Sequence, residues 1–156
     1  MQGLVPGIRM RTESHIMIKQ LSVFLENRSS RLEKLAEIFV DNQISIVSVS
    51  FSDSTEYGLI RMIVSDPERA AQVLKENGFA VTINTVLAVG LPKRKGALGD
   101  MMKLLSACEI EYIYTLSAKH ENAYMVVKVA DVYSAMAILE NKNYVLADED
   151  LAYSMN

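Results

Sequence analysis

Cysteine and histidine are scarce in this sequence of 156 residues. Its one cysteine, Cys108, cannot form a disulfide within the chain, and a lone thiol is typical of a reducing, cytoplasmic setting. The two histidines, His15 and His120, lie far apart, and no metal-binding spacing such as His-x-x-x-His occurs. We therefore expect no metal site and no cofactor, and we interpret Cys108 as a small buried apolar residue.

An excess of positive charge and a long apolar run are also missing. The 16 Lys and Arg stand against 19 Asp and Glu, a net charge of −3, which disfavours nucleic acid and anionic membranes as partners. No apolar run approaches the ~20 residues that cross a bilayer as a helix. Residues 1 to 16 lack the apolar segment of a secretory signal, and we interpret them as a loose N-terminal extension.

Half of the residues are apolar, and their spacing predicts a series of strands and helices. The predicted order is a strand over 18–25, a helix beginning at Ser30, strands over 46–52 and 57–65, a further helix, and a strand over 79–84. This further helix has Asp66 as its N-cap and Pro67 as its first residue, and Gly78 takes the left-handed position after it. Ser30 is chosen as the helix start because Ser30 and Glu33 have capping-box spacing. This β-α-β-β-α-β order is typical of the ferredoxin-like fold, an α+β class with antiparallel sheets.

The same order then repeats 66 residues later. Leu21, Val23 and Leu25 correspond to Leu87, Val89 and Leu91, and with an offset of 65 Gly78 corresponds to Asn143, a residue type that also tolerates positive φ. We predict two tandem domains, residues 17–84 and 85–156, the second including a short tail. Because no linker separates them, they should pack together. The second strand of the second copy is apolar on both faces, with Ile113 on one and Tyr112, Tyr114 and Leu116 on the other, so it should be covered on both sides.

Catalysis and RNA binding are the weaker alternatives. Asp53 and Glu56 are possible general bases, but an acidic hairpin tip is usually only solvated, so we do not expect an enzyme. RNA-binding modules of this order stack bases on aromatic residues of the third strand. The strand over 59–64 has none, and the second copy offers only Tyr124.

The two strand-to-helix turns remain as candidate ligand sites, because helix N-termini favour anions. The first contains Asn27, Arg28, Ser29, Ser30, Arg31 and Leu32, and the second contains Lys93, Arg94, Lys95, Gly96, Ala97 and Leu98. The first turn suits a zwitterion such as an amino acid, with a carboxylate on the helix N–H groups and an ammonium on an amide oxygen or on Asp53. From chemistry alone, a helix cap, a turn glycine and a solvated basic surface explain these residues at least as well.

Together, the tandem β-α-β-β-α-β units and these turns resemble the ACT-domain family of small-molecule regulatory modules. The family turn is typically Asn or Asp, a basic residue, Pro, Gly, a variable residue and Leu, followed by a helix and a segment like Gly-Ile-Asn-Ile. The matching segments here are 27–32 with 42–46 in the first copy, and 94–98 with 108–112 in the second. The resemblance covers all but residues 1–16 and is closest to stand-alone proteins of two ACT domains without a catalytic domain.

The resemblance implies a non-catalytic regulator that binds an amino acid at interfaces between ACT domains and acts allosterically on an enzyme. There, the strand-to-helix turn of one domain meets the second strand of another. Asn27 takes the amide-bearing position, Gly96 is the family glycine, and Ser30 replaces that glycine in the first copy. Eight strands in two open sheets would leave edges that need cover, so we also expect a homodimer. The rival hypothesis is a scaffold or regulatory subunit that binds a partner protein and no small molecule.

Overall fold

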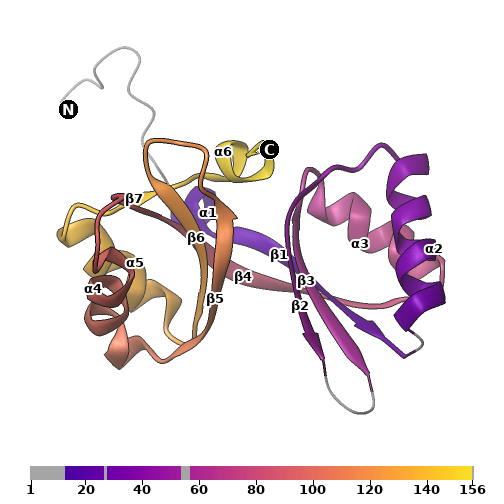
Figure 1. Ribbon diagram of the computed structural model, residues 1–156, viewed down its shortest axis with the longest axis horizontal. Helices are drawn as coiled ribbons and strands as arrows, with labels where there is room; N and C mark the ends of the chain where they lie inside the picture. Colours follow the sequence, from indigo (N-terminus) through magenta and orange to yellow (C-terminus); the bar gives the residue numbers. More distant parts are fainter. Residues whose placement is uncertain (1–12, 27, 54–56, 156) are drawn as a thin grey trace, which may run out of the picture.

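The β-α-β-β-α-β order occurs twice in the chain, as predicted (Figure 1). The computed structural model describes residues 13–26, 28–53 and 57–155. The elements are α1 (Glu13–Ile16), β1 (Ile18–Leu25), α2 (Arg28–Asp41), β2 (Ile46–Asp53), β3 (Gly58–Val64), α3 (Pro67–Glu76), β4 (Ala80–Leu91), α4 (Ala97–Leu104), a 3-10 turn (Ser106–Cys108), β5 (Ile110–Ser117), β6 (Ala123–Val129), α5 (Val132–Asn141), β7 (Val145–Leu146) and α6 (Glu149–Tyr153). All strand pairs are antiparallel, which confirms the predicted fold class. None of the helices in the described ranges is long and apolar enough to cross a membrane.

Strand β4 belongs to both copies. Its first part pairs with β1, from Ala80 opposite Phe24 to Val86 opposite Ile18, and its second part pairs with β6 from Leu87 onward. One seven-stranded sheet results, in the order β2-β3-β1-β4-β6-β5, with β7 also paired to β4. The prediction of eight strands in two separate sheets is wrong, because no turn residue interrupts the extended backbone between Asn84 and Thr85.

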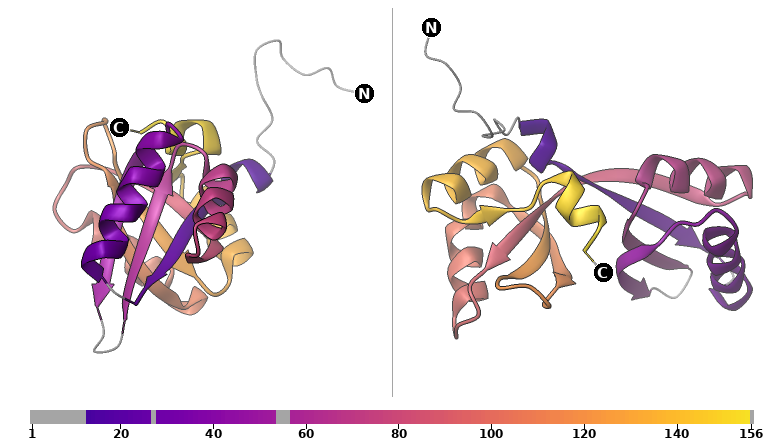
Figure 2. Two further views of the ribbon diagram at one scale, coloured as in Figure 1. Left: turned by 90° about the vertical axis from the view of Figure 1, so that its right-hand side faces the viewer. Right: turned by 90° about the horizontal axis from the view of Figure 1, so that it is seen from above.

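Each half of the sheet carries its own two helices. Figures 1 and 2 show α2 and α3 on the outer face of the first half and α4 and α5 on the outer face of the second, while the faces without helices turn toward each other. Under the helices lie two apolar cores, centred on residues such as Leu21, Met62 and Leu74 in the first half and Leu87, Met101 and Leu139 in the second. Cys108 is buried in the second core, as predicted, and burial raises the pKa of its thiol.

The helix ends test the local predictions. Asp66 caps α3 by accepting a hydrogen bond from the Arg69 N–H at 3.3 Å, and Gly78 follows that helix at φ +83°, both as predicted. Helix α2 begins at Arg28, so Ser30 lies inside its first turn and the predicted start at Ser30 is wrong. Ser30 and Glu33 have capping-box spacing, but both lie inside the helix and not at its start.

The N-terminal segment is less loose than predicted where it reaches the fold. Residues 13–16 form the short helix α1, and Ile16 is only 2% exposed. Ile16 packs in the second core, although the strand that follows it belongs to the first half. The chain therefore contacts the second half at Ile16, before it enters the first half at β1.

A third apolar cluster, here named the inter-sheet cluster, lies between the helix-free faces of the two halves of the sheet. It contains Ile18 and Ile63 from the first half and Leu116, Val126 and Met155 from the second, the last beyond α6. Strand β5 is covered on both sides, as predicted: Ile113 packs against the second core and Leu116 belongs to this inter-sheet cluster. The two halves are therefore joined by buried apolar surface as well as by β4.

A polar network crosses the same interface. Gln20 of β1 is fully buried, and its amide nitrogen donates to the Tyr112 hydroxyl at 2.8 Å and to the Ser22 hydroxyl at 3.2 Å. Its amide oxygen accepts from the Tyr114 hydroxyl at 2.7 Å, and the Arg61 guanidinium lies 3.8 Å from the centre of the Tyr112 ring. Burial raises the pKa of Tyr114 well above its usual value, so this hydroxyl stays protonated and donates. One glutamine thus holds two tyrosines of the opposite half.

Candidate functional site

The first strand-to-helix turn is described only in part. Asn27 lies outside the described residues, and of Arg28, Ser29 and Asp53 the structure describes the backbone alone, at the start of α2 and the end of β2. Ser30 is exposed, and Leu32 packs against the first core. The predicted role of Asn27, and those of the Arg28, Ser29 and Asp53 side chains, therefore stay predictions.

Arg31 connects this turn to the turn that precedes β4. Its guanidinium carbon lies 3.8 Å from the centre of the Phe79 ring, and its Nη2 donates to the Gly78 carbonyl at 3.1 Å. Beside it lies a hollow of about 380 Å³, here named the first hollow, which is lined by Phe24, Glu26, Arg31, Gly78 and Ala80. Its size is within the range of small-molecule sites.

The second turn is fully described. Gly96 precedes α4 at φ +84°, a left-handed conformation that favours glycine, and Ala97 begins the helix as a buried residue. Lys93 Nζ donates to the Ala118 carbonyl at 2.9 Å, which ties the turn to the loop between β5 and β6. Arg94 Nη2 lies 2.9 Å from Asp100 Oδ2. Lys95 and Leu98 are exposed, so the predicted basic turn presents much of its surface to solvent.

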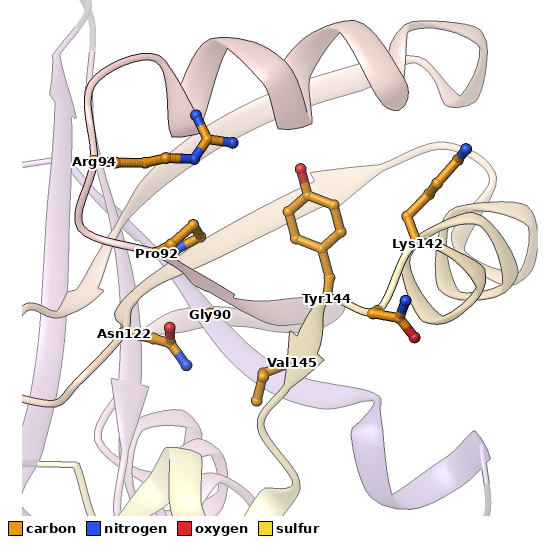
Figure 3. A pocket seen from close by; sticks show the side chains of 8 residues that line it. Gly90, Pro92, Arg94, Asn122, Lys142, Tyr144 and Val145 are labelled. Atoms are coloured by element: carbon orange, nitrogen blue, oxygen red, sulfur yellow. The ribbon is translucent and has the colours of Figure 1, made fainter.

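Arg94 also borders a hollow of about 340 Å³, here named the second hollow (Figure 3). Its lining residues are Gly90, Pro92, Arg94, Asn122, Lys142, Asn143, Tyr144 and Val145. Figure 3 shows the side chains of Arg94 and Lys142 on either side of the Tyr144 ring. The predicted site residues Lys93, Lys95, Gly96, Ala97 and Leu98 do not line it.

The two hollows occupy equivalent positions in the two copies. With the offsets of the repeat, Phe24 corresponds to Gly90, Glu26 to Pro92, Gly78 to Asn143 and Ala80 to Val145. The pairings Phe24–Ala80 and Gly90–Val145 occur in the two halves of the sheet. Each hollow forms because the end of one strand meets the beginning of its antiparallel neighbour, which brings the two turns together.

Different side chains occupy these equivalent positions in the two copies. In the first, the Phe24 and Tyr57 rings pack with centroids 5.8 Å apart, whereas Gly90 and Asn122 stand at the corresponding positions of the second. Glu26 and Arg31 give the first hollow one charge of each sign. The second hollow has the cations Arg94 and Lys142 in its lining and no acidic side chain among the described lining residues. The two hollows therefore differ in charge.

Gly90 is a position where the close approach of neighbours requires glycine. A Cβ there would lie 3.1 Å from the Tyr124 ring and 3.3 Å from the Cβ atoms of Asn122 and Val145. We expect Gly90→Ala to lower the free energy of unfolding by about 1–3 kcal/mol through overpacking. Gly99→Ala is the matched control: apart from its chain neighbours and the backbone of α4, nothing lies within 4 Å of an added Cβ, and alanine should stabilise α4 by up to about 1 kcal/mol. Urea titration of both variants measures the difference, and equal effects would contradict the steric argument.

Sequence reasoning named the strand-to-helix turns but missed the helix-to-strand turns that complete each hollow, including Lys142 and Tyr144. The available signal was Gly78 and its counterpart Asn143, which take positive φ at the same end of each copy. Elsewhere in the described chain, no three His, Cys, Asp or Glu side chains are grouped as a metal ion would require. Tyr124, the aromatic residue considered for RNA stacking, is only 7% exposed and belongs to the inter-sheet cluster.

Comparison with known proteins places these features in a family. A family model described as an ACT domain pair matches residues 16–155. Protein BT0572 from Bacteroides thetaiotaomicron is 33% identical with a TM-score of 0.83, and the match covers 89% of this chain and 97% of that one. The ligand-free regulatory subunit of aspartate kinase from Thermus thermophilus is similar in fold, with 13% identity, a TM-score of 0.56 and coverage of 81% and 92%. The regulatory subunit of aspartate kinase from Thermus flavus is 14% identical with a TM-score of 0.52, and the match covers 79% of this chain and 90% of that one. A comparison with curated proteins found no match.

Proposed function

Because this chain belongs to the ACT domain pair family, we propose that it is a non-catalytic regulatory protein that binds an amino acid at its ACT domains. The two Thermus proteins of similar fold are regulatory subunits of aspartate kinase. By analogy, we assign this chain a role in which ligand binding is transmitted to a partner enzyme through a shift between domain arrangements. The free Cys108 thiol fits the reducing cytoplasm as its place of action.

The observation that carries this proposal is the pair of opposite charges in the first hollow. The Arg31 guanidinium suits a ligand carboxylate, and the Glu26 carboxylate suits an ammonium group. Both charges lie where β1 passes into α2, the turn that the sequence singled out. A free amino acid carries the complementary pair of charges within a molecule small enough for this hollow.

The experiment is a thermal-unfolding screen of the full chain against the common amino acids. A cognate ligand at a hundred times its Kd stabilises by ~2.7 kcal/mol. Glu26→Gln should remove most of this ligand-dependent stabilisation because it deletes the partner of the ammonium group, and Asn27→Ala tests the residue predicted from sequence. Glu33→Gln, an exposed change on α2, is the matched control and should leave it intact. If no amino acid raises the melting temperature, the proposal is wrong.

A homodimer completes the proposal, and the edge of the first half supplies a surface for it. Strand β2 ends the sheet, and its side chains Val49 and Phe51 are 52% and 45% exposed. They pair across strands with Met62 and Ile60 of the first core, so they lie on the face of the sheet that carries the helices. An edge strand with exposed apolar residues is an open template for pairing with another chain.

Helix α2 extends this apolar edge. Its Arg31 and the following Asn42 face the α3 side, where they contact Phe79 and Arg69. Ala36 and Val40 lie roughly 150° around the helix from them, since successive residues are ~100° apart. Val40 is 76% exposed and lines a shallow hollow together with Ala36, Glu37 and Asp41. In the proposed dimer, β2 and this flank of α2 meet their equivalents in a second copy.

Phe51→Lys should convert the dimer to a monomer, because it places a charge on the proposed apolar interface. Sedimentation equilibrium should then show the mass of one 17.4 kDa chain instead of two. Met102→Lys is the matched control, since Met102 is also 45% exposed but lies on α4 in the other half. A dimer that survives Phe51→Lys, or dissociates equally with Met102→Lys, would contradict this interface.

The same apolar edge also fits the second candidate function, a scaffold or regulatory subunit that binds a partner protein without a small-molecule ligand. Affinity capture from the native cell separates the two functions. Amino-acid binding predicts that partner binding changes when the ligand is added. A stable partner complex indifferent to every amino acid favours the scaffold.

A further inference from the structure

The second hollow differs from the first in charge. Arg94 and Lys142 reach it from two separate turns, and no acidic side chain stands among its described lining residues. Asp100 pairs with Arg94 from α4 at 2.9 Å, so Lys142 remains as a cation without a carboxylate partner in the described part of the chain. The site therefore keeps a positive charge and lacks a group suited to an ammonium.

The polar groups of the second hollow are available to a ligand. Within the described ranges, Asn122, Lys142 and Tyr144 have no hydrogen-bond or ion-pair partner for their side chains. Arg94 uses Nη2 for Asp100 and Nη1 for the Lys95 carbonyl, which orients the guanidinium and leaves several of its five donors free. Amide, hydroxyl, ammonium and guanidinium donors thus border one space.

The repeat shows how the second hollow differs from its counterpart in the first copy. In the first copy, Arg31 covers the Phe79 ring and hydrogen-bonds to the Gly78 carbonyl. In the second, Ala97 and Tyr144 stand at the positions of Arg31 and Phe79. The short Ala97 side chain cannot cover the ring as Arg31 does, and the Tyr144 ring carries a hydroxyl that Phe79 lacks. Figure 3 shows this Tyr144 hydroxyl pointing toward α4, with Arg94 beside it.

We propose that the second hollow binds a small molecule bearing an oxyanion, a dicarboxylate or a phosphate, between Arg94, Lys142, Tyr144 and the Asn122 amide. Two cations and neutral donors are the groups that recognise such oxygens. This site is separate from the amino-acid site of the first hollow. In this proposal the protein binds two ligands of different charge, one in each copy.

Isothermal titration of the full chain with inorganic phosphate and with succinate, at constant ionic strength in chloride, tests this site. Saturable binding of one of them is expected, and the tighter one identifies the chemical source. Lys142→Gln should raise its Kd at least about tenfold, since a hydrogen bond to a charged group contributes ~1.5–3 kcal/mol. Tyr144→Phe should raise it about fivefold. Lys142 is exposed, so folding should be unaffected.

Two controls keep the outcome specific. Lys103→Gln removes an exposed lysine of α4 outside the lining and should leave the Kd unchanged. Glu26→Gln alters only the first hollow and should also leave anion binding unchanged, which separates this proposal from the proposed amino-acid site. Binding of neither anion with a Kd below about 10 mM, or an equal loss with Lys103→Gln, overturns the proposal.

Discussion

Leu74→Ala is expected to lower the free energy of unfolding by about 2–5 kcal/mol, and to do so for both halves of the chain at once. Leu74 is fully buried in the first core, where truncation removes apolar contacts and leaves a cavity. All the described residues of this core belong to the first half, but the second half shares β4 and the inter-sheet cluster with it. We therefore expect one cooperative transition.

The tyrosines provide the readout. Of the seven, only Tyr57 belongs to the first copy, and Tyr112, Tyr114 and Tyr153 contact Gln20 and Lys19 of the first half, so near-ultraviolet tyrosine absorbance reports on the second half and on the interface. In urea, this signal and far-ultraviolet circular dichroism should shift to the same lower midpoint in Leu74→Ala at fixed protein concentration. Lys75→Ala, one residue further along α3 and exposed, is the matched control and should change the midpoint little. An unshifted tyrosine midpoint would mean that the two halves unfold independently.

Gln20→Ala should destabilise the protein by about 3 kcal/mol. It removes the partner of the Tyr112 and Tyr114 hydroxyls, which lie 2.8 and 2.7 Å from the Gln20 amide, and leaves a cavity between the two halves of the sheet. Gln72→Ala is the matched control, because the Gln72 amide bonds to Glu76 on the exposed side of α3. Its effect should stay within about 0.5 kcal/mol.

A double-mutant cycle with Tyr114→Phe isolates the bond across the interface. Gln20→Ala and Tyr114→Phe should cost less together than the sum of their separate effects, with a coupling energy of about 1–2 kcal/mol. Additive effects, or a cost of Gln20→Ala below about 1 kcal/mol, would show that the tyrosines find other partners. In that case the orientation of the halves depends on β4 and the apolar cluster alone.

In the proposed regulatory role this interface matters, because a ligand can act only by favouring one arrangement of the halves over another. The Gln20 network and the C-terminal helix both fix the present arrangement. The Tyr153 hydroxyl of α6 accepts a hydrogen bond from the Lys19 N–H at 2.9 Å, and burial raises the pKa of Tyr153 to about 12. Lys19 also pairs with Glu68 of α3. Segments from both ends of the chain thus meet between the halves.

Local patterns identified most of the elements. The twofold repeat, the cap at Asp66 and the positive φ at Gly78 and Asn143 all follow from residue type and spacing. The predicted start of α2 at Ser30 is two residues late, because Ser30 and Glu33 have capping-box spacing but lie inside the helix. The roles predicted for the first turn, Asn27 above all, stay predictions.

The two β-α-β-β-α-β units and their cores can be predicted from the sequence, since these depend on periodicity and turn chemistry within a few residues. The folded chain alone reveals that β4 serves both units, that Gln20 reaches Tyr112 and Tyr114 more than 90 residues away, and that Lys142 and Tyr144 face Arg94. These features were beyond prediction because strand partners and hollows depend on which strand ends become neighbours. That choice is made by contacts distant in sequence, which no local pattern encodes.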